Sequence, residues 1–171
     1  ATVASAHGKL YTTHMRDEGD TIAEALHETF QVGRDACCGV QVSHHKCAGL
    51  ANHGRSTETL ALIEAAMTQQ AVGLDTTPWI ASATMLNSGR HKQATRVIVS
   101  ESLPHPELAG QDLADIAKQW GVSLDEAVAR LIPAAGIFFI MDEYDVQRIL
   151  SFKHTIICSD GIHKGSHPHP R

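Results

Sequence analysis

Residues 38–46 read CGVQVSHHK, a short apolar run that ends at His44 and His45. The same pattern occurs twice more, because His14 follows KLYTT and Asp160 follows TIICS. Each run has the composition of a buried strand. In parallel α/β barrels, catalytic side chains lie at the C-terminal ends of several strands. Imidazole and carboxylate groups bind a divalent cation and activate its bound water. The three strand ends therefore predict a metal-dependent hydrolase.

Around these runs, predicted strands alternate with predicted helices. The predicted strands are residues 10–13, 39–43, 72–75, 95–100, 136–141 and 155–158. The predicted helices are residues 21–35, 56–70, 111–120, 124–131 and 142–152. The expected N-terminal capping residues are Thr21, Ser56, Ser123 and Asp142. The alternation and the continuous apolar strands predict an α/β fold with a parallel sheet and crossover helices.

Two regions are predicted to interrupt this alternation. Residues 76–90, TTPWIASATMLNSGR, are expected to form a long loop at a strand end, and loops of this length are commonly functional. Two short helices farther along the chain are interpreted as an insertion near residues 101–133. The whole chain, residues 1–171, falls within the size range of one domain. A complete eight-stranded barrel typically needs about 250 residues, so a barrel would be only partly present.

Composition excludes several classes of partner. The net charge is −5 and the isoelectric point is near 6.2, and no run rich in Lys or Arg occurs. Nucleic acid and anionic membranes are therefore not expected partners. No apolar stretch approaches about 18 residues, and the first residues lack the pattern of a signal peptide. We expect a soluble, cytoplasmic protein that acts on a small molecule, with its oligomeric state left open.

The cysteines are predicted to be reduced. Cys37, Cys38, Cys47 and Cys158 show no CxxC spacing, and an adjacent pair would form only a strained disulfide. Cys158 is interpreted as a core residue. Cys47 is close in sequence to a predicted ligand, and a metal role is its alternative reading.

Several blocks of the sequence together resemble a known family. In chain order they are YTTHMRDEGD, VSHHK, GRSTETLALIEAAM, HPELAGQDLADIA, MDEYDVQRIL, and SDG followed by HPHPR. They closely resemble the N-acyl-D-amino-acid deacylases, or D-aminoacylases, of the amidohydrolase superfamily. This resemblance implies a zinc-dependent hydrolase of N-acyl-D-amino acids with a distorted (β/α)8 TIM barrel. The chain would be a C-terminal-half fragment with about strands five to eight and a small helical insertion.

The resemblance also implies roles for single residues. His14 and His44 match zinc-ligand histidines, and Asp160 matches the catalytic aspartate and is predicted to be a metal ligand as well. Lys46 is similar in position to a residue that binds the substrate carboxylate. Arg96 is a second candidate for substrate binding, although an arginine that opens a strand is often merely solvated. The expected mechanism has metal-bound water as the nucleophile and Asp160 as general base and then general acid.

Other interpretations of these residues stay open. His14 could be a solvated loop histidine, and Asp160 could belong to an Asp-Gly turn. Side-chain alternation allows only one of His44 and His45 to face the site if the strand extends that far, and we choose His44. The family's first-strand histidine pair and ligand cysteine would lie upstream of this chain, which is therefore expected to be inactive alone.

The sequence departs from the family at the substrate contacts. Thr77, Trp79 and Ala83 replace family tyrosines and a serine, and Ile162 begins a run that differs from the usual LPHD. These differences leave two alternative functions. One is an amidohydrolase acting on a cyclic amide, urea or ester, and the other is a non-catalytic half-barrel with a binding or structural role.

Overall fold

The computed structural model describes residues 1–161, and Ile162 and the histidine-containing tail lie outside the described residues. The chain divides into two units. Unit 1 comprises Ala1–Pro78 and Met141–Asp160, and unit 2 comprises Trp79–Ile140 and, of the described residues, also Gly161. None of the helices within residues 1–161 combines the length and hydrophobicity needed to cross a membrane.

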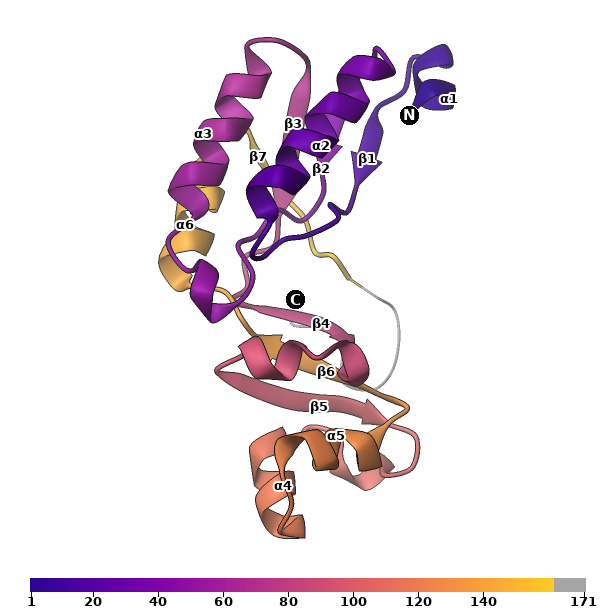
Figure 1. Cartoon of the computed structure of the whole chain (residues 1–171), viewed down its shortest axis with the longest axis vertical. Coiled ribbons are helices and arrows are strands. Elements are labelled where there is room, and N and C mark those ends of the chain that lie inside the picture. The colour runs from indigo at the N-terminus through magenta and orange to yellow at the C-terminus, as the bar shows by residue number, and fades with distance from the viewer. Residues whose placement is uncertain (162–171) are drawn as a thin grey trace. The chain divides into compact units, whose positions relative to one another are not determined.

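Unit 1 contains a parallel sheet with crossover helices, as predicted (Figure 1). The strand order is β1-β2-β3-β7. The strands are β1 (Tyr11–Thr13), β2 (Val40–Val42), β3 (Val72–Thr76) and β7 (Thr155–Ile157). The helices are α1 (Thr2–Ala6), α2 (Ile22–Asp35), α3 (Ser56–Met67) and α6 (Glu143–Ser151), with a 3-10 turn at Leu50–Asn52. Because the strands are parallel, their C-terminal ends lie along one edge of the sheet.

The core of unit 1 lies between this sheet and the helices that pack on it. The helix α2 buries Ile22, Leu26 and Phe30 at helical spacing, as the sequence pattern predicts. Gly33 continues this buried face, and a Cβ atom at Gly33 would overlap the side chain of Val40. The glycine therefore permits the close approach of α2 to β2.

Unit 2 corrects two predictions. Ala81–Met85, expected to be part of a loop, forms strand β4. The strands predicted at residues 95–100 and 136–141 exist, but as β5 (Arg96–Ser102) and β6 (Ala134–Phe139) of an antiparallel sheet in the order β4-β6-β5. A strand's own residues do not specify the direction of its neighbour. The helices of unit 2 are α4 (Leu113–Trp120) and α5 (Leu124–Leu131), with 3-10 turns at Leu86–Ser88, Arg90–Gln93 and Pro106–Leu108.

Helix capping agrees with the sequence at two of four predicted positions. Ser123 accepts a hydrogen bond from the backbone of α5, and Asp142 accepts two from α6. The predictions for the other two helices were wrong. Thr21 makes no capping bond to α2, because its N–H and hydroxyl both donate to Asp17. Ser56 lies inside α3.

Candidate metal centre

Two histidines meet at the C-terminal edge of the parallel sheet. His14 follows β1 and His44 follows β2, and these strands are neighbours in register. The Nδ1 atom of His14 lies 2.9 Å from the Nε2 atom of His44. The two rings are arranged edge to face, with their centroids 4.6 Å apart. Strand ends that are separate in the sequence thus bring two imidazole nitrogens to one point.

A third potential ligand, Glu18, was not predicted from the sequence. Across residues 1–161, His14, Glu18 and His44 form the group of His, Cys, Asp and Glu side chains close enough to share a metal ion, with ligand atoms within 4.8 Å of one another. Glu18 follows His14 by four residues in HMRDEGD, but nothing in that run distinguishes it from Asp17 or Asp20. Its importance depends on the tertiary structure.

Glu18 is buried in a tight group of charges. Its Oε1 atom lies 2.8 Å from Nδ1 of His44 and 2.7 Å from Nζ of Lys46, and only 3% of its side chain is exposed. Burial acts to raise the pKa of Glu18, but the hydrogen bond with His44 and the charge of Lys46 outweigh it and lower the pKa to about 2. Glu18 is therefore a carboxylate at neutral pH.

Asp75 fixes the backbone of His44. His44 has a φ of +40°, in the left-handed region that non-glycine residues rarely adopt. The Oδ1 atom of Asp75 accepts the His44 N–H at 2.8 Å, and Oδ2 accepts the Gln41 side-chain amide at 2.7 Å. Partial burial acts to raise the pKa of Asp75, but these hydrogen bonds lower it below its ordinary value. The aspartate that ends the apolar run VGLD is the sequence signal for this role.

His45 faces the interior, away from His44's partners. It is fully buried, and its Nε2 atom lies 2.9 Å from Oγ1 of Thr59 in α3. Burial lowers the pKa of His45 to about 4, so its ring is neutral at pH 7. The two neighbouring histidines therefore have different environments, although β2 ends at Val42 and His44 lies in a turn rather than in the strand.

Asp160 follows β7 at the same edge of the sheet but is not in the three-residue group. It is exposed and has a φ of +46°. Its backbone N–H bonds to the thiol of Cys158, which also hydrogen-bonds Asp75. Burial and the Asp75 contact raise the pKa of Cys158 to about 11. The catalytic role of Asp160 stays a prediction.

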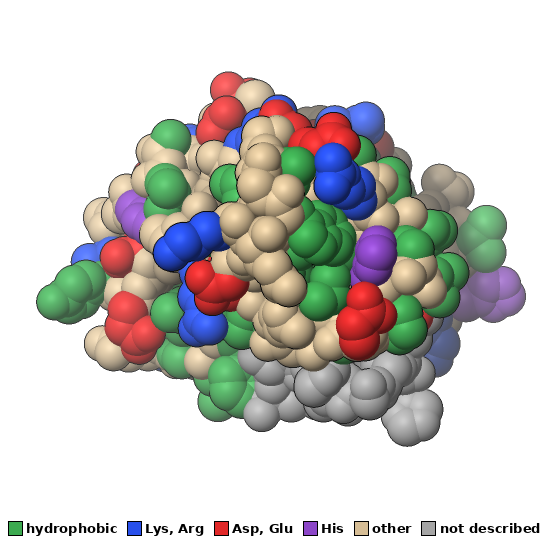
Figure 2. Space-filling view, turned by 90° about the horizontal axis from the view of Figure 1, so that it is seen from below, with side chains coloured by type: hydrophobic (Ala, Val, Ile, Leu, Met, Phe, Trp, Pro, Cys, Tyr) green, Lys and Arg blue, Asp and Glu red, His purple; other side chains and the backbone are tan. Residues whose placement is uncertain are grey.

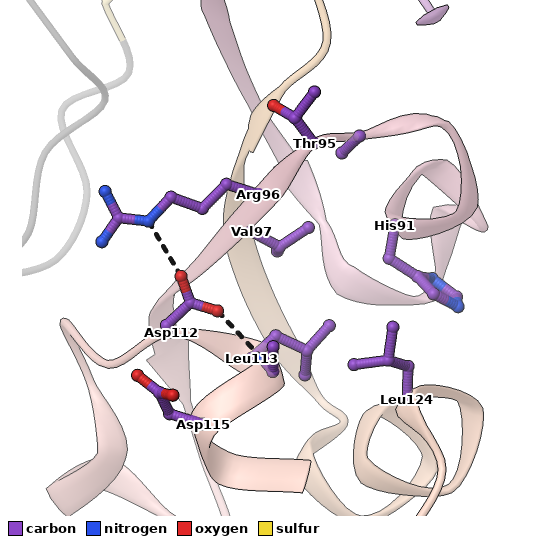
Figure 3. Close-up of a pocket in the computed structure, with 10 residues that line it drawn as sticks. His91, Thr95, Arg96, Val97, Asp112, Leu113, Asp115 and Leu124 are labelled. Carbon is purple, nitrogen blue, oxygen red and sulfur yellow. Dashed lines mark hydrogen bonds and ion pairs between the residues drawn. The ribbon is translucent and has the colours of Figure 1, made fainter. Parts of the chain in front are cut away.

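The two predicted substrate-binding cations lie in different units. Lys46 is buried in unit 1, where its ammonium pairs with Glu18. Arg96 opens β5 in unit 2, and its Nε atom donates to Oδ2 of Asp112 at 2.8 Å. Arg96 and Asp112 line a pocket of about 270 Å³ together with Thr95 (Figure 3). On the face drawn in Figure 2, basic side chains lie among acidic ones.

The donor set of unit 1 fits a zinc ion. Zinc takes imidazole nitrogen at about 2.0–2.1 Å, so two nitrogens 2.9 Å apart are within reach of one ion. His14 is exposed and would leave the site open to substrate and water. Two histidines also favour zinc over magnesium, which prefers oxygen ligands. The arrangement is suited to hold a metal ion at a strand-end site open to solvent.

Relatives with known activities match nearly the whole chain. No protein-family model matches it. D-aminoacylase from Alcaligenes xylosoxydans xylosoxydans is 52% identical over 167 residues, which cover 98% of this chain and 34% of that protein. N-acyl-D-aspartate deacylase from the same organism is 44% identical, over 96% of this chain and 33% of its own length.

Solved structures give the same result. A crystal structure of D-aminoacylase, described as defining a novel subset of amidohydrolases, matches with a TM-score of 0.91 and 50% identity over 98% of this chain and 35% of that one. N-acyl-D-glutamate deacylase from Bordetella bronchiseptica, complexed with zinc and a phosphonate inhibitor, matches with a TM-score of 0.92 and 40% identity over 99% of this chain and 36% of that one.

These matches show that the chain is similar, over nearly its whole length, to part of proteins described as amidohydrolases. Within that class it is homologous to the D-aminoacylases and other N-acyl-D-amino-acid deacylases, which confirms the resemblance inferred from the sequence. The chain spans about a third of the length of the curated relatives that it matches.

Proposed function

We propose that the protein containing this chain hydrolyses the amide bond of N-acyl-D-amino acids, releasing a carboxylate and a D-amino acid. The convergence of His14 and His44 at neighbouring strand ends carries this proposal, together with 52% identity to a D-aminoacylase. The four parallel strands would be about strands five to eight of a (β/α)8 barrel, and residues near 101–133 would belong to an insertion. The reduced cysteines support a cytoplasmic location.

In this proposal, His14 Nδ1 and His44 Nε2 hold a zinc ion. When bound, zinc polarises the amide carbonyl and lowers the pKa of a coordinated water. Asp160 accepts the proton of the attacking water and returns it to the departing amine. The exposed position of Asp160 at the sheet edge supports this role, because it is accessible to a substrate.

Lys46 is proposed to bind the carboxylate of the substrate. An ammonium group has three N–H donors, and one of them is directed at Glu18, 2.7 Å away. We assign another of these donors to the substrate carboxylate, for which a lysine acts as a point charge. Arg96 is the second proposed carboxylate-binding cation, with Asp112 holding its guanidinium.

A segment exchange tests this proposal. Residues 1–171 would replace the matching third of the Alcaligenes D-aminoacylase, and release of amino acid would be measured from N-acetyl-D- and N-acetyl-L-amino acids. We expect zinc-dependent release of the D-amino acid. The matched control, the same chimera with Asp160→Asn, should lose at least about 10²-fold in turnover while keeping its zinc. A folded, zinc-loaded chimera that hydrolyses no N-acyl-D-amino acid would contradict the proposal.

A further inference from the structure

The two ring nitrogens of His44 face different partners. Nε2 lies 2.9 Å from Nδ1 of His14, where the metal is proposed to bind. Nδ1 lies 2.8 Å from Oε1 of Glu18 and 2.8 Å from Nζ of Lys46. A neutral imidazole carries one N–H and one lone pair, so only one nitrogen is available to a metal. The position of a single proton on His44 therefore decides whether the site can bind zinc.

Two proton arrangements are compatible with these distances. In the first, Nε2–H donates to His14 and Nδ1 accepts from Lys46, which leaves no lone pair directed at the metal position. In the second, Nδ1–H donates to Glu18, and Lys46 also donates to Glu18. The lone pair of Nε2 then faces His14. The total number of protons is the same in both arrangements, because the proton lost from Nε2 reappears on Nδ1.

Of the two groups that contact Nδ1, only Glu18 can accept a hydrogen bond, since an ammonium has no acceptor. We propose that Glu18 is a positioning residue that selects the Nδ1–H tautomer of His44 and thereby presents Nε2 to the metal. Lys46 neutralises the buried carboxylate. This inference rests on the proposed metal centre. Carboxylates that hold a ligating histidine in this way typically change metal affinity by about 10–100-fold when removed.

The burial of these three side chains strengthens the preference for the Nδ1–H tautomer of His44. The side chains of Glu18 and Lys46 are 3% and 8% exposed, and that of His44 is 13% exposed. Bulk water therefore has little access to replace Glu18 as the acceptor. Because Glu18 also lies just before α2 and close after His14, one short segment supplies both a ligand and the group that orients the second ligand.

A pair of double variants tests the proposal without leaving a buried charge unpaired. Glu18→Gln with Lys46→Met keeps a carbonyl acceptor for Nδ1–H, whereas Glu18→Leu with Lys46→Met removes it. Zinc affinity of the 171-residue chain would be measured by competition with a chromophoric chelator. We expect the Leu pair to bind zinc at least about 10-fold more weakly than the Gln pair. Glu64→Gln, an exposed change of the same type on α3, should leave the affinity unchanged.

Nitrogen-15 NMR of the unsubstituted chain gives a second readout that does not depend on the folding of any variant. With zinc bound, the His44 ring should show the proton on Nδ1 and the metal on Nε2. Equal affinities for the Gln and Leu pairs, or a metal bound through Nδ1, would overturn the role of Glu18 alone. A chain that binds no zinc at all would instead contradict the proposed metal centre.

Discussion

His44 and His45 are adjacent in the chain, but they contact different parts of the structure. The His44 ring nitrogens lie beside His14 and Glu18 at the strand-end edge, and the His45 ring is in the core against Thr59. The contacts of each histidine ring depend on the direction in which its side chain leaves the backbone. Metal binding and folding stability should therefore respond separately to changes at these two positions.

We expect His44→Ala to lower the zinc affinity of the chain with little loss of stability. His45→Ala should lower the free energy of unfolding by about 2 kcal/mol or more, because it leaves a cavity beside α3. The His45→Ala variant should still bind zinc. Zinc titration and urea unfolding of both variants distinguish these effects. Equal zinc loss from two folded variants would show that the assignment of the two rings is wrong.

The cysteines provide a second comparison between single residues. Burial, with the charge of Asp145, raises the pKa of Cys47 to about 12, whereas Cys37 is exposed. Because the thiolate is the reactive form, iodoacetamide at pH 8 should modify Cys37 well before Cys47 in the folded chain. Mass spectrometry of timed samples measures this, with urea-unfolded chain as the control that should remove the difference. Equal rates in the folded chain would contradict the buried position of Cys47.

Among the helices, α6 supplies the group that holds the start of α3. The carboxylate of Asp145 accepts the N–H of Gly54 at 2.6 Å and that of Ser56 at 3.1 Å, and it is 1% exposed. Arg148 donates to the Ser56 hydroxyl at 2.7 Å. This contact replaces the capping role that the sequence predicted for Ser56. It joins segments about ninety residues apart, as the separation of 91 between Gly54 and Asp145 shows.

Asp145→Asn should lower the free energy of unfolding by about 1–3 kcal/mol. The two carboxylate oxygens each accept a backbone N–H, whereas an amide has only one acceptor oxygen. Its NH₂ group would therefore face one of these N–H donors. Urea denaturation measures the change. Asp142→Asn is the matched control. Asn is as good an N-cap as Asp, so this variant should cost only a few tenths of a kcal/mol. If the two variants had the same small effect, the contact between α6 and α3 would not contribute to stability.

The sequence predicted the elements better than their pairing. Helical periodicity predicted α2 and α3. The positions of His14 and His44 after apolar runs predicted that both residues lie at strand ends. Strand β4 was missed because Ala81–Met85 has small, mixed residues that resemble a loop. Glu18 and Asp75 were missed for a different reason. Their roles depend on which side chains tertiary folding places beside them, and neither periodicity nor spacing contains that information.

For the molecule as a whole, the parallel sheet of unit 1 has two outer strands. Within residues 1–161, β1 pairs with β2 alone, and β7 pairs with β3 alone. Apolar side chains are exposed at these edges: Leu10 is 59% exposed, Ile156 61% and Ile157 68%. Unpaired, apolar strand edges promote association with other chains.

The purified 171-residue chain should therefore self-associate and should not hydrolyse N-acyl-D-amino acids by itself. Light scattering and an amino-acid release assay with added zinc measure the two properties. Replacing Ile156 and Ile157 by Lys should reduce association, because charged side chains on an edge strand oppose pairing. Zinc-dependent turnover by the purified chain, or a monomer at all concentrations, would contradict this prediction.

We propose that the ends of β1 and β2 together hold a metal ion. Anomalous diffraction at the zinc absorption edge, from crystals of the chain grown with zinc, tests it directly. We expect a peak bonded to Nδ1 of His14 and Nε2 of His44, at about 2.0–2.1 Å from each. Crystals of His44→Ala should lack this peak. A zinc-free gap between the two rings at saturating zinc, or a peak bonded to other residues alone, would contradict the claim.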